Sequence, residues 1–149
     1  MRKIQERRFR VEREEKVNEL QLVDLLSTVN AGFGCGFEMI GVIENEDDKV
    51  IYNKARKTLV EEGMNTNKIC VEDVWARILF SEKPLKVMEI ETEEIHNITL
   101  TDILIGFDAY FEERPANGLP TVEEIIENGD FLDADAVLQY AAYGEIIYG

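Results

Sequence analysis

The single histidine, His96, decides how much acid–base chemistry this chain of 149 residues can support. A Ser-His-Asp or Cys-His site would have to use this imidazole as its general base. His96 lies in the segment EEIHNIT, between a predicted strand and a predicted helix, where we expect a solvent-exposed loop histidine beside two glutamates. Cys35 lies among glycines, with no cation or helix N-terminus beside it that would activate its thiol. The sequence therefore predicts no catalytic nucleophile.

The glycines at positions 32, 34 and 36, in the segment AGFGCGF, invite comparison with a phosphate-binding loop. The GxGxxG spacing is absent, the segment follows a predicted helix instead of a strand, and no Lys-Ser/Thr pair comes after it. We interpret it as a tight turn that ends the preceding helix.

The two cysteines, Cys35 and Cys70, form no CxxC pair and have only one histidine to complete a metal set. This composition excludes a structural zinc site. A disulfide between them is geometrically possible. A chain with no export signal is expected in a reducing compartment, where buried free thiols are the commoner outcome.

Carboxylates are numerous enough to suggest a two-metal phosphoryl-transfer site or a glycosidase, since both need only acids. Glu112 and Glu113 are neighbours and point about 100° apart on a helix, whereas Asp102 and Asp108 lie nearly two turns apart. None of these pairs shares a helix face at the spacing of one turn. A metal-dependent hydrolase built on such acids is the least favoured class of function.

Asp130, Asp133 and Asp135 resemble the start of a calcium loop. The glycine at the sixth position and the glutamate at the twelfth do not follow from Asp130 or Asp133. We interpret Asp133 as a helix cap and the other two as solvated acids. The sequence thus predicts no catalytic, cofactor-binding or metal-binding residue and no cofactor.

Apolar spacing at helical period predicts most of the elements that would carry these residues. Asp47 or Asp48 can cap the second helix, Thr121 and Glu124 form a capping box, and Asp133 can cap the last helix, which Gly144 ends. The expected helices cover residues 17–29, 48–62, 71–79, 100–113, 121–128 and 133–143.

Short strands are expected at 84–91 and 145–148, and 37–44 reads as a short strand or an apolar connector. Pro84 favours an edge position or the first position for the strand at 84–91. The predicted fold is a helix-dominated α+β single domain, with a charged N-terminal arm at 1–16 and a globular domain at 17–149.

No stretch approaches the about 20 uncharged apolar residues that cross a bilayer, and the charged N-terminal sequence has no signal-peptide pattern. We therefore expect a cytoplasmic protein without membrane contact.

The net charge of −15 is unevenly distributed. Residues 1–16 hold seven basic and four acidic side chains, residues 17–88 hold eight basic and twelve acidic, and residues 89–149 hold fifteen acids against Arg114 alone. The strongly acidic C-terminal half opposes direct nucleic-acid binding by Arg7, Arg8 and Arg10 of the arm. The arm could instead extend the first helix or dock on an acidic patch of a second subunit.

Carboxylates dispersed over folded helices would form a rigid negative surface that resembles the phosphates of a nucleic acid. In size and charge the chain is similar to small acidic proteins of phages and mobile elements that block restriction or CRISPR nucleases. Our hypothesis is a non-enzymatic protein-interaction module that inhibits a basic nucleic-acid-binding protein by mimicry. The partner-binding residues would be Asp102, Asp108, Glu112, Glu113, Glu123, Glu124, Glu127, Asp130, Asp133 and Asp135.

The alternative is a structural or assembly subunit that forms oligomers through exposed aromatic surfaces. Its aromatic residues would be Phe107, Tyr110, Phe111, Tyr140, Tyr143 and Tyr148.

Overall fold

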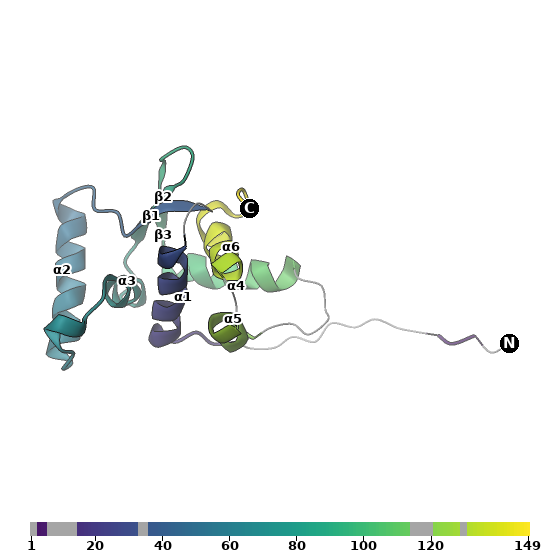
Figure 1. Cartoon of the computed structure of the whole chain (residues 1–149), viewed down its shortest axis with the longest axis horizontal. Coiled ribbons are helices and arrows are strands. Elements are labelled where there is room, and N and C mark those ends of the chain that lie inside the picture. Colours follow the sequence, from purple (N-terminus) through teal and green to yellow (C-terminus); the bar gives the residue numbers. More distant parts are fainter. Residues whose placement is uncertain (1–2, 6–14, 33–35, 114–120, 129–130) are drawn as a thin grey trace.

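The computed structural model describes residues 3–5, 15–32, 36–113, 121–128 and 131–149. These residues form a helix-dominated α+β single domain, as the sequence predicts (Figure 1). The elements in chain order are α1 (Glu19–Ala31), β1 (Phe37–Ile40), α2 (Glu46–Glu61), the 3₁₀ turn η1 (Thr66–Lys68), α3 (Val71–Phe80), β2 (Leu85–Glu89), β3 (Ile95–Ile98), α4 (Leu100–Glu113), α5 (Val122–Asn128) and α6 (Phe131–Tyr143).

All six predicted helices are present, but two of the expected caps are wrong. Asn45, and not Asp47 or Asp48, caps α2, because its side chain accepts the Asp48 N–H. Asp133 lies inside α6, which already begins at residue 131. Thr121 does cap α5, because its hydroxyl accepts the Glu124 N–H. In both α2 and α5 a short polar side chain just before the helix accepts an N–H of the first turn.

The three strands form one antiparallel sheet in the order β1-β2-β3. The strand predicted at 84–91 is β2. It is the central strand, so of the two positions that Pro84 favours the edge position is not the one used. Pro84 lies just before its first residue, so the missing N–H of proline removes no bond from the ladder. The connector at 37–44 contributes only the four residues of β1, and β3 was not predicted.

The strand predicted at 145–148 is absent from the described residues. This segment is extended, but its N–H groups bond to a side chain: those of Ile147 and Tyr148 both donate to Gln139 Oε1 at 2.9 Å. Gln139 Nε2 in turn donates to the carbonyl oxygen of Tyr148 at 2.8 Å. One buried glutamine of α6 thus replaces the neighbouring strand that the C-terminal residues would need.

A single apolar core joins the helices to the sheet. Helix α1 packs against α3 and α6, α2 packs on α3, and α4 packs against α6 (Figure 1). Gly106 permits the last contact, since a Cβ there would lie 2.5 Å from the carbonyl oxygen of Val137. One side of α4 therefore packs closely against the backbone of α6, and its other side is exposed.

Candidate interaction surface

The structure divides the ten predicted partner-binding acids by environment. Asp130 lies outside the described residues. The others lie on three helices: Asp102, Asp108, Glu112 and Glu113 on α4, Glu123, Glu124 and Glu127 on α5, and Asp133 and Asp135 on α6.

Asp135 is a core residue, so its prediction as a solvated partner-binding acid is wrong. Its side chain is 2% exposed. One carboxylate oxygen accepts the Gly36 N–H at 3.1 Å, and the other accepts from Gln139 Nε2 at 2.6 Å. A buried carboxylate must find such donors, because an unpartnered charge in the interior is costly. Asp135 therefore fixes the start of β1 against α6 and cannot contact a partner.

Asp133 and Asp102 are also engaged within the fold. The phenol of Tyr110 donates to Asp133 Oδ1 at 2.5 Å, which links α4 to α6. Asp102 accepts the Thr99 N–H at 2.9 Å, while its own N–H donates to the Thr99 hydroxyl. This reciprocal pair is a capping box at the start of α4. Both acids are half-buried and stabilise helix positions, so neither is available in full to a partner.

The remaining six acids are exposed, and we call them the acidic surface. On α5 they alternate with the buried Val122 and Ile125, which hold the helix against the core. On α4, Asp108 and Glu112 are four residues apart and share one face. The members are Asp108, Glu112, Glu113, Glu123, Glu124 and Glu127.

The acidic surface has no cation of its own within the described part of the chain. Arg114 is the only Lys or Arg after residue 88, and it lies outside the described residues. The single apolar core packs the opposite faces of α4 and α5, so these carboxylates belong to ordered helices. Their charges are left to solvent.

The rest of the molecule pairs its charges differently. Arg77 of α3 donates to Glu19 at 2.6 Å and also bonds to Glu62. The hydrogen bonds that Arg77 donates to Glu19 and Glu62 raise the pKa of Arg77 above its ordinary value. Lys86 of β2 lies 2.8 Å from Glu44 and 2.9 Å from Asp48. Its hydrogen bond lowers the pKa of Asp48 below the ordinary value. The described ion pairs with Lys and Arg thus all lie before residue 89.

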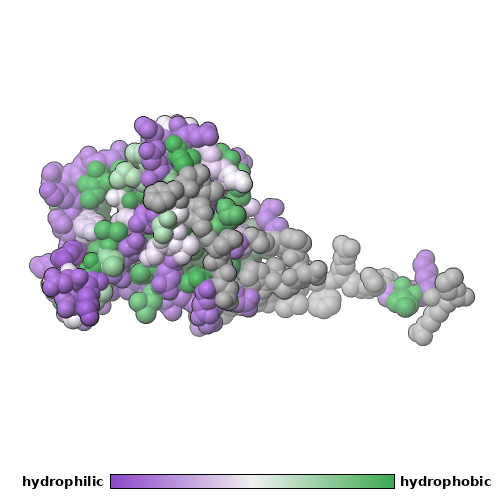
Figure 2. Space-filling view, in the orientation of Figure 1, coloured by the Kyte–Doolittle hydropathy of each residue, from purple (hydrophilic) through white to green (hydrophobic). Residues whose placement is uncertain are grey.

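Two apolar side chains share the exposed face of α4 with Asp108 and Glu112. Leu104 is 43% exposed and Ile105 is 57% exposed. They lie three or four residues before Asp108 on the helix, where side chains are neighbours. Figure 2 shows that apolar and hydrophilic residues are also interspersed on the face that it presents. The exposed side of α4 therefore combines negative charge with apolar contact area.

The aromatic residues of the predicted assembly surface mostly face inward. Phe107 and Tyr110 are buried, and Phe111 packs on both of them. Tyr143 is half-buried and its ring stacks on Phe37. Tyr140 is partly buried against the core, and Tyr148 is only partly exposed. Because these rings are used in packing, they do not form the exposed aromatic surfaces that the alternative needs.

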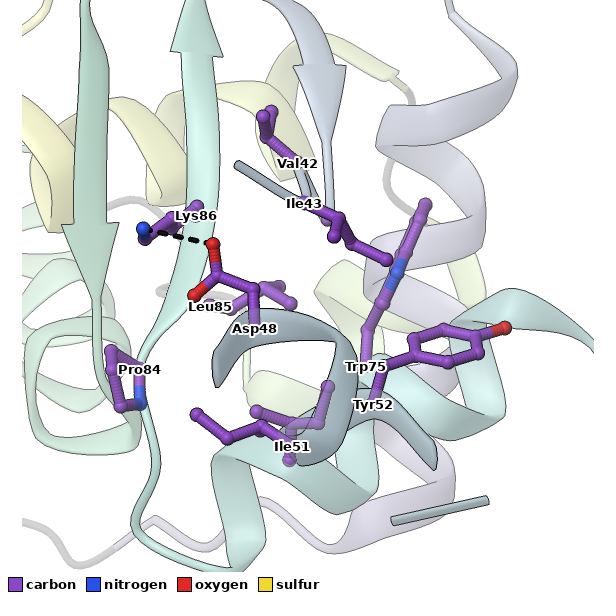
Figure 3. Close-up of a pocket in the computed structure, with 11 residues that line it drawn as sticks. Val42, Ile43, Asp48, Ile51, Tyr52, Trp75, Pro84, Leu85 and Lys86 are labelled. Atoms are coloured by element: carbon purple, nitrogen blue, oxygen red, sulfur yellow. Dashed lines mark ion pairs between the residues drawn. The ribbon is translucent and has the colours of Figure 1, made fainter. Parts of the chain in front are cut away.

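The pocket in Figure 3 lies between α2, α3 and β2 and is lined by Tyr52, Trp75 and the ion pair of Asp48 with Lys86. Its volume is about 20 Å³. A cavity of that size holds a single water molecule, whereas sites for small organic ligands are at least an order of magnitude larger. This pocket therefore has no room for an organic substrate.

The predicted environments of His96 and the cysteines also need correction. His96 lies in β3 and is half-buried, not in an exposed loop. Its Nε2 is 3.1 Å from the carboxylate of Glu89, which the sequence reasoning missed. Cys70 is exposed just before α3, contrary to the expected buried thiol. Cys35 and the glycine at 34 lie outside the described residues, while Gly32 ends α1 as predicted.

No family model, curated protein or solved structure matches this chain. None of the helices in the described ranges has the length and apolar character needed to cross a membrane.

Proposed function

We propose that the protein is a non-enzymatic interaction module whose acidic surface binds the basic nucleic-acid-binding surface of another protein and competes with the nucleic acid. The observation that carries the proposal is the set of six exposed carboxylates on α4 and α5, which have no Lys or Arg partner in the described part of the chain. A nuclease of the restriction or CRISPR type is the partner class that this chemistry fits. The encounter would take place in the cytoplasm.

The energetic reasoning rests on the burial of the opposite helix faces. Ile103, Phe107 and Tyr110 of α4 and Val122 and Ile125 of α5 are all buried. Anchored helices keep carboxylates in place, so a partner does not have to order them on binding. A fixed array of one sign steers a basic partner electrostatically and accelerates association at low salt.

Leu104 and Ile105 give the surface a second mode of contact. Charge complementarity governs mainly the association rate, whereas apolar side chains that become desolvated in the interface slow dissociation. The two kinds of residue on α4 therefore predict separable kinetic effects.

The test is a binding assay in which purified protein is titrated against a panel of basic nucleases at several NaCl concentrations, with duplex DNA as competitor. We compare a surface variant (Asp108→Asn, Glu112→Gln, Glu127→Gln) with a control variant (Asp24→Asn, Glu38→Gln, Glu82→Gln). Each removes three exposed negative charges, but the control acids lie on α1, on β1 and after α3.

The surface variant should associate about ten times more slowly at low salt, and the difference should shrink as salt screens the charges. The control variant should bind like the parent protein. Equal loss in both variants would show that net charge alone acts, and absence of binding at low salt across the panel would refute the proposal.

A further inference from the structure

The turn between β2 and β3 brings three metal-ligating side chains together: Glu89, Glu94 and His96. A carboxylate oxygen of each glutamate and one ring nitrogen of His96 all lie within 4.8 Å of one another. His96 Nε2 is 3.1 Å from Glu89 Oε2 and 3.9 Å from Glu94 Oε2. This cluster is separate from the acidic surface and is not used by the function proposed above.

Sheet geometry explains why these three side chains meet. The Glu89 N–H donates to the carbonyl oxygen of Glu94 at 2.9 Å, so the two residues face each other at the end of the ladder. Directly opposed residues of an antiparallel pair share a face, and residues two apart on one strand also share a face. Glu94 and His96 are two apart. The hairpin therefore projects all three side chains on the same side.

Glu89 occupies a position where the strand pattern demands an apolar residue. Leu85, Val87 and Glu89 are the buried positions of β2, and Glu89 is 7% exposed. A carboxylate placed there must be satisfied by hydrogen bonds. The phenol of Tyr148 donates to Glu89 Oε1 at 2.5 Å, while Oε2 is the oxygen that faces His96.

The surroundings orient the two less exposed ligands. Tyr148 holds one oxygen of Glu89 and leaves the other directed at the cluster. The ring of His96 packs edge-on against Tyr143, with centroids 5.0 Å apart. Partners of this kind fix the orientation of ligands in established metal sites.

We propose that Glu89, Glu94 and His96 bind one divalent transition-metal ion of the Zn²⁺ class. Two donors bound at about 2.0–2.1 Å to one ion lie about 2.8–3.4 Å apart in octahedral or tetrahedral geometry. The observed 3.1 Å between His96 Nε2 and Glu89 Oε2 matches this spacing. The Glu94 side chain is 69% exposed, so it can close the remaining distance.

The donor set selects the metal class. An imidazole nitrogen favours Zn²⁺ and related ions over Mg²⁺ and Ca²⁺, which prefer oxygen ligands alone. The ion would lie between His96 Nε2 and Glu89 Oε2 in place of their direct contact, and its charge would compensate the two neighbouring carboxylates. Three protein ligands leave a coordination position open for water. A bound ion would also tie the hairpin to the C-terminal segment through Tyr148.

The experiment is a calorimetric titration of the chelator-treated full chain with ZnCl₂, and with MgCl₂ and CaCl₂ for comparison. His96 is the only histidine, so its ring proton resonances in NMR report on this cluster alone. Glu94→Gln tests a ligand, and Glu93→Gln is the matched control, since it alters the same turn by the same charge.

We expect one Zn²⁺ per chain, a shift of the His96 resonances, and affinity about tenfold or more lower in Glu94→Gln and His96→Ala. Glu93→Gln should bind like the parent protein, and Mg²⁺ and Ca²⁺ should not shift the imidazole. Circular dichroism confirms that each variant is folded. Zn²⁺ binding that survives both ligand substitutions, or leaves the His96 resonances in place, would assign the ion to another site and overturn the proposal. No Zn²⁺ binding would overturn it as well, without bearing on the nuclease assay.

Discussion

Replacement of Asp135 by alanine distinguishes an acid that stabilises the fold from the exposed acids of the acidic surface. Asp135 accepts two hydrogen bonds in the core, from the Gly36 N–H and from Gln139 Nε2. Hydrogen bonds to a charged group contribute about 1.5–3 kcal/mol each, and a buried donor left without a partner costs about 1–3 kcal/mol. In Asp135→Ala the Gln139 amide still donates to the Tyr148 carbonyl oxygen. The Gly36 N–H loses its carboxylate acceptor and has no such second bond.

These contributions set the size of the expected effect. Two lost bonds amount to about 3–6 kcal/mol, and removing the buried charge relieves part of its desolvation cost. We therefore expect the free energy of unfolding to fall by about 3 kcal/mol. For a domain of this size the melting temperature should fall by about 6–12 °C.

Asp135→Asn should lie between the parent protein and Asp135→Ala. The asparagine carbonyl oxygen can still accept the Gly36 N–H, but its amide would face the Gln139 amide, donor against donor. Gln139 cannot reverse its side chain without losing the bonds from Ile147 and Tyr148 to its oxygen. Half of the interaction is thus retained.

Urea unfolding followed by the fluorescence of Trp75, the only tryptophan and a buried one, measures these differences. Asp108→Ala is the matched control, because Asp108 is exposed and such substitutions change stability by about 0.5 kcal/mol or less. A loss below about 1 kcal/mol for Asp135→Ala would refute the reasoning, since it would place Asp135 among the solvated acids.

Two further predictions concern the α4–α6 contact and the charge pairs near β2. Gly106→Ala should lower the urea midpoint, because a Cβ 2.5 Å from the Val137 carbonyl oxygen costs about 1–3 kcal/mol in overpacking, against about 1 kcal/mol gained in helix propensity; a more stable variant would contradict the packing argument. Lys86→Met should reduce stability at neutral pH, and its difference from the parent should shrink as pH falls below 3.8. The folded pKa of Asp48 is lower than that ordinary value, so its stabilising effect is present above it and is lost as pH falls through the folded pKa. Unfolding curves between neutral and acidic pH measure this, and a difference independent of pH would contradict it.

Helices were predictable here because their signals are local. The apolar spacing of residues 71–79 and 100–113 fits the observed α3 and α4 to within a residue. Their buried faces are formed by neighbours along the chain, so a short window of sequence contains the necessary pattern.

The sheet was harder to predict because it depends on distant partners. The IHNI segment of β3 is four residues long with polar residues at its centre, and only its pairing with β2 makes it a strand. The C-terminal EIIY segment has the composition of a strand, yet the N–H groups of Ile147 and Tyr148 donate to the Gln139 side chain and not to a neighbouring strand. The period-two pattern of Leu85, Val87 and Glu89 did contain a usable signal, since it places Glu89 on the buried face.

The acids show the same limit. In the sequence, Asp135 differs in no way from the solvated acids around it, because its donor at Gly36 is 99 residues away. The sequence therefore predicted that acids would be exposed on these helices, but not which ones. Six of the ten predicted acids are exposed, while Asp102, Asp133 and Asp135 stabilise the fold.

With only six exposed acids, the density of negative charge limits how closely this surface could mimic a nucleic acid. Asp108, Glu112 and Glu113 span about 7.5 Å of helix axis at the α-helical rise, a mean axial spacing of about 3.8 Å between charges. Duplex DNA carries about one charge per 1.7 Å of its axis. Because the line of charge on α4 is sparser than the phosphates, electrostatics alone would leave this surface the weaker competitor at physiological salt. A tight complex must then gain affinity from contacts that salt does not screen, and on this face Leu104 and Ile105 are the exposed side chains able to make them.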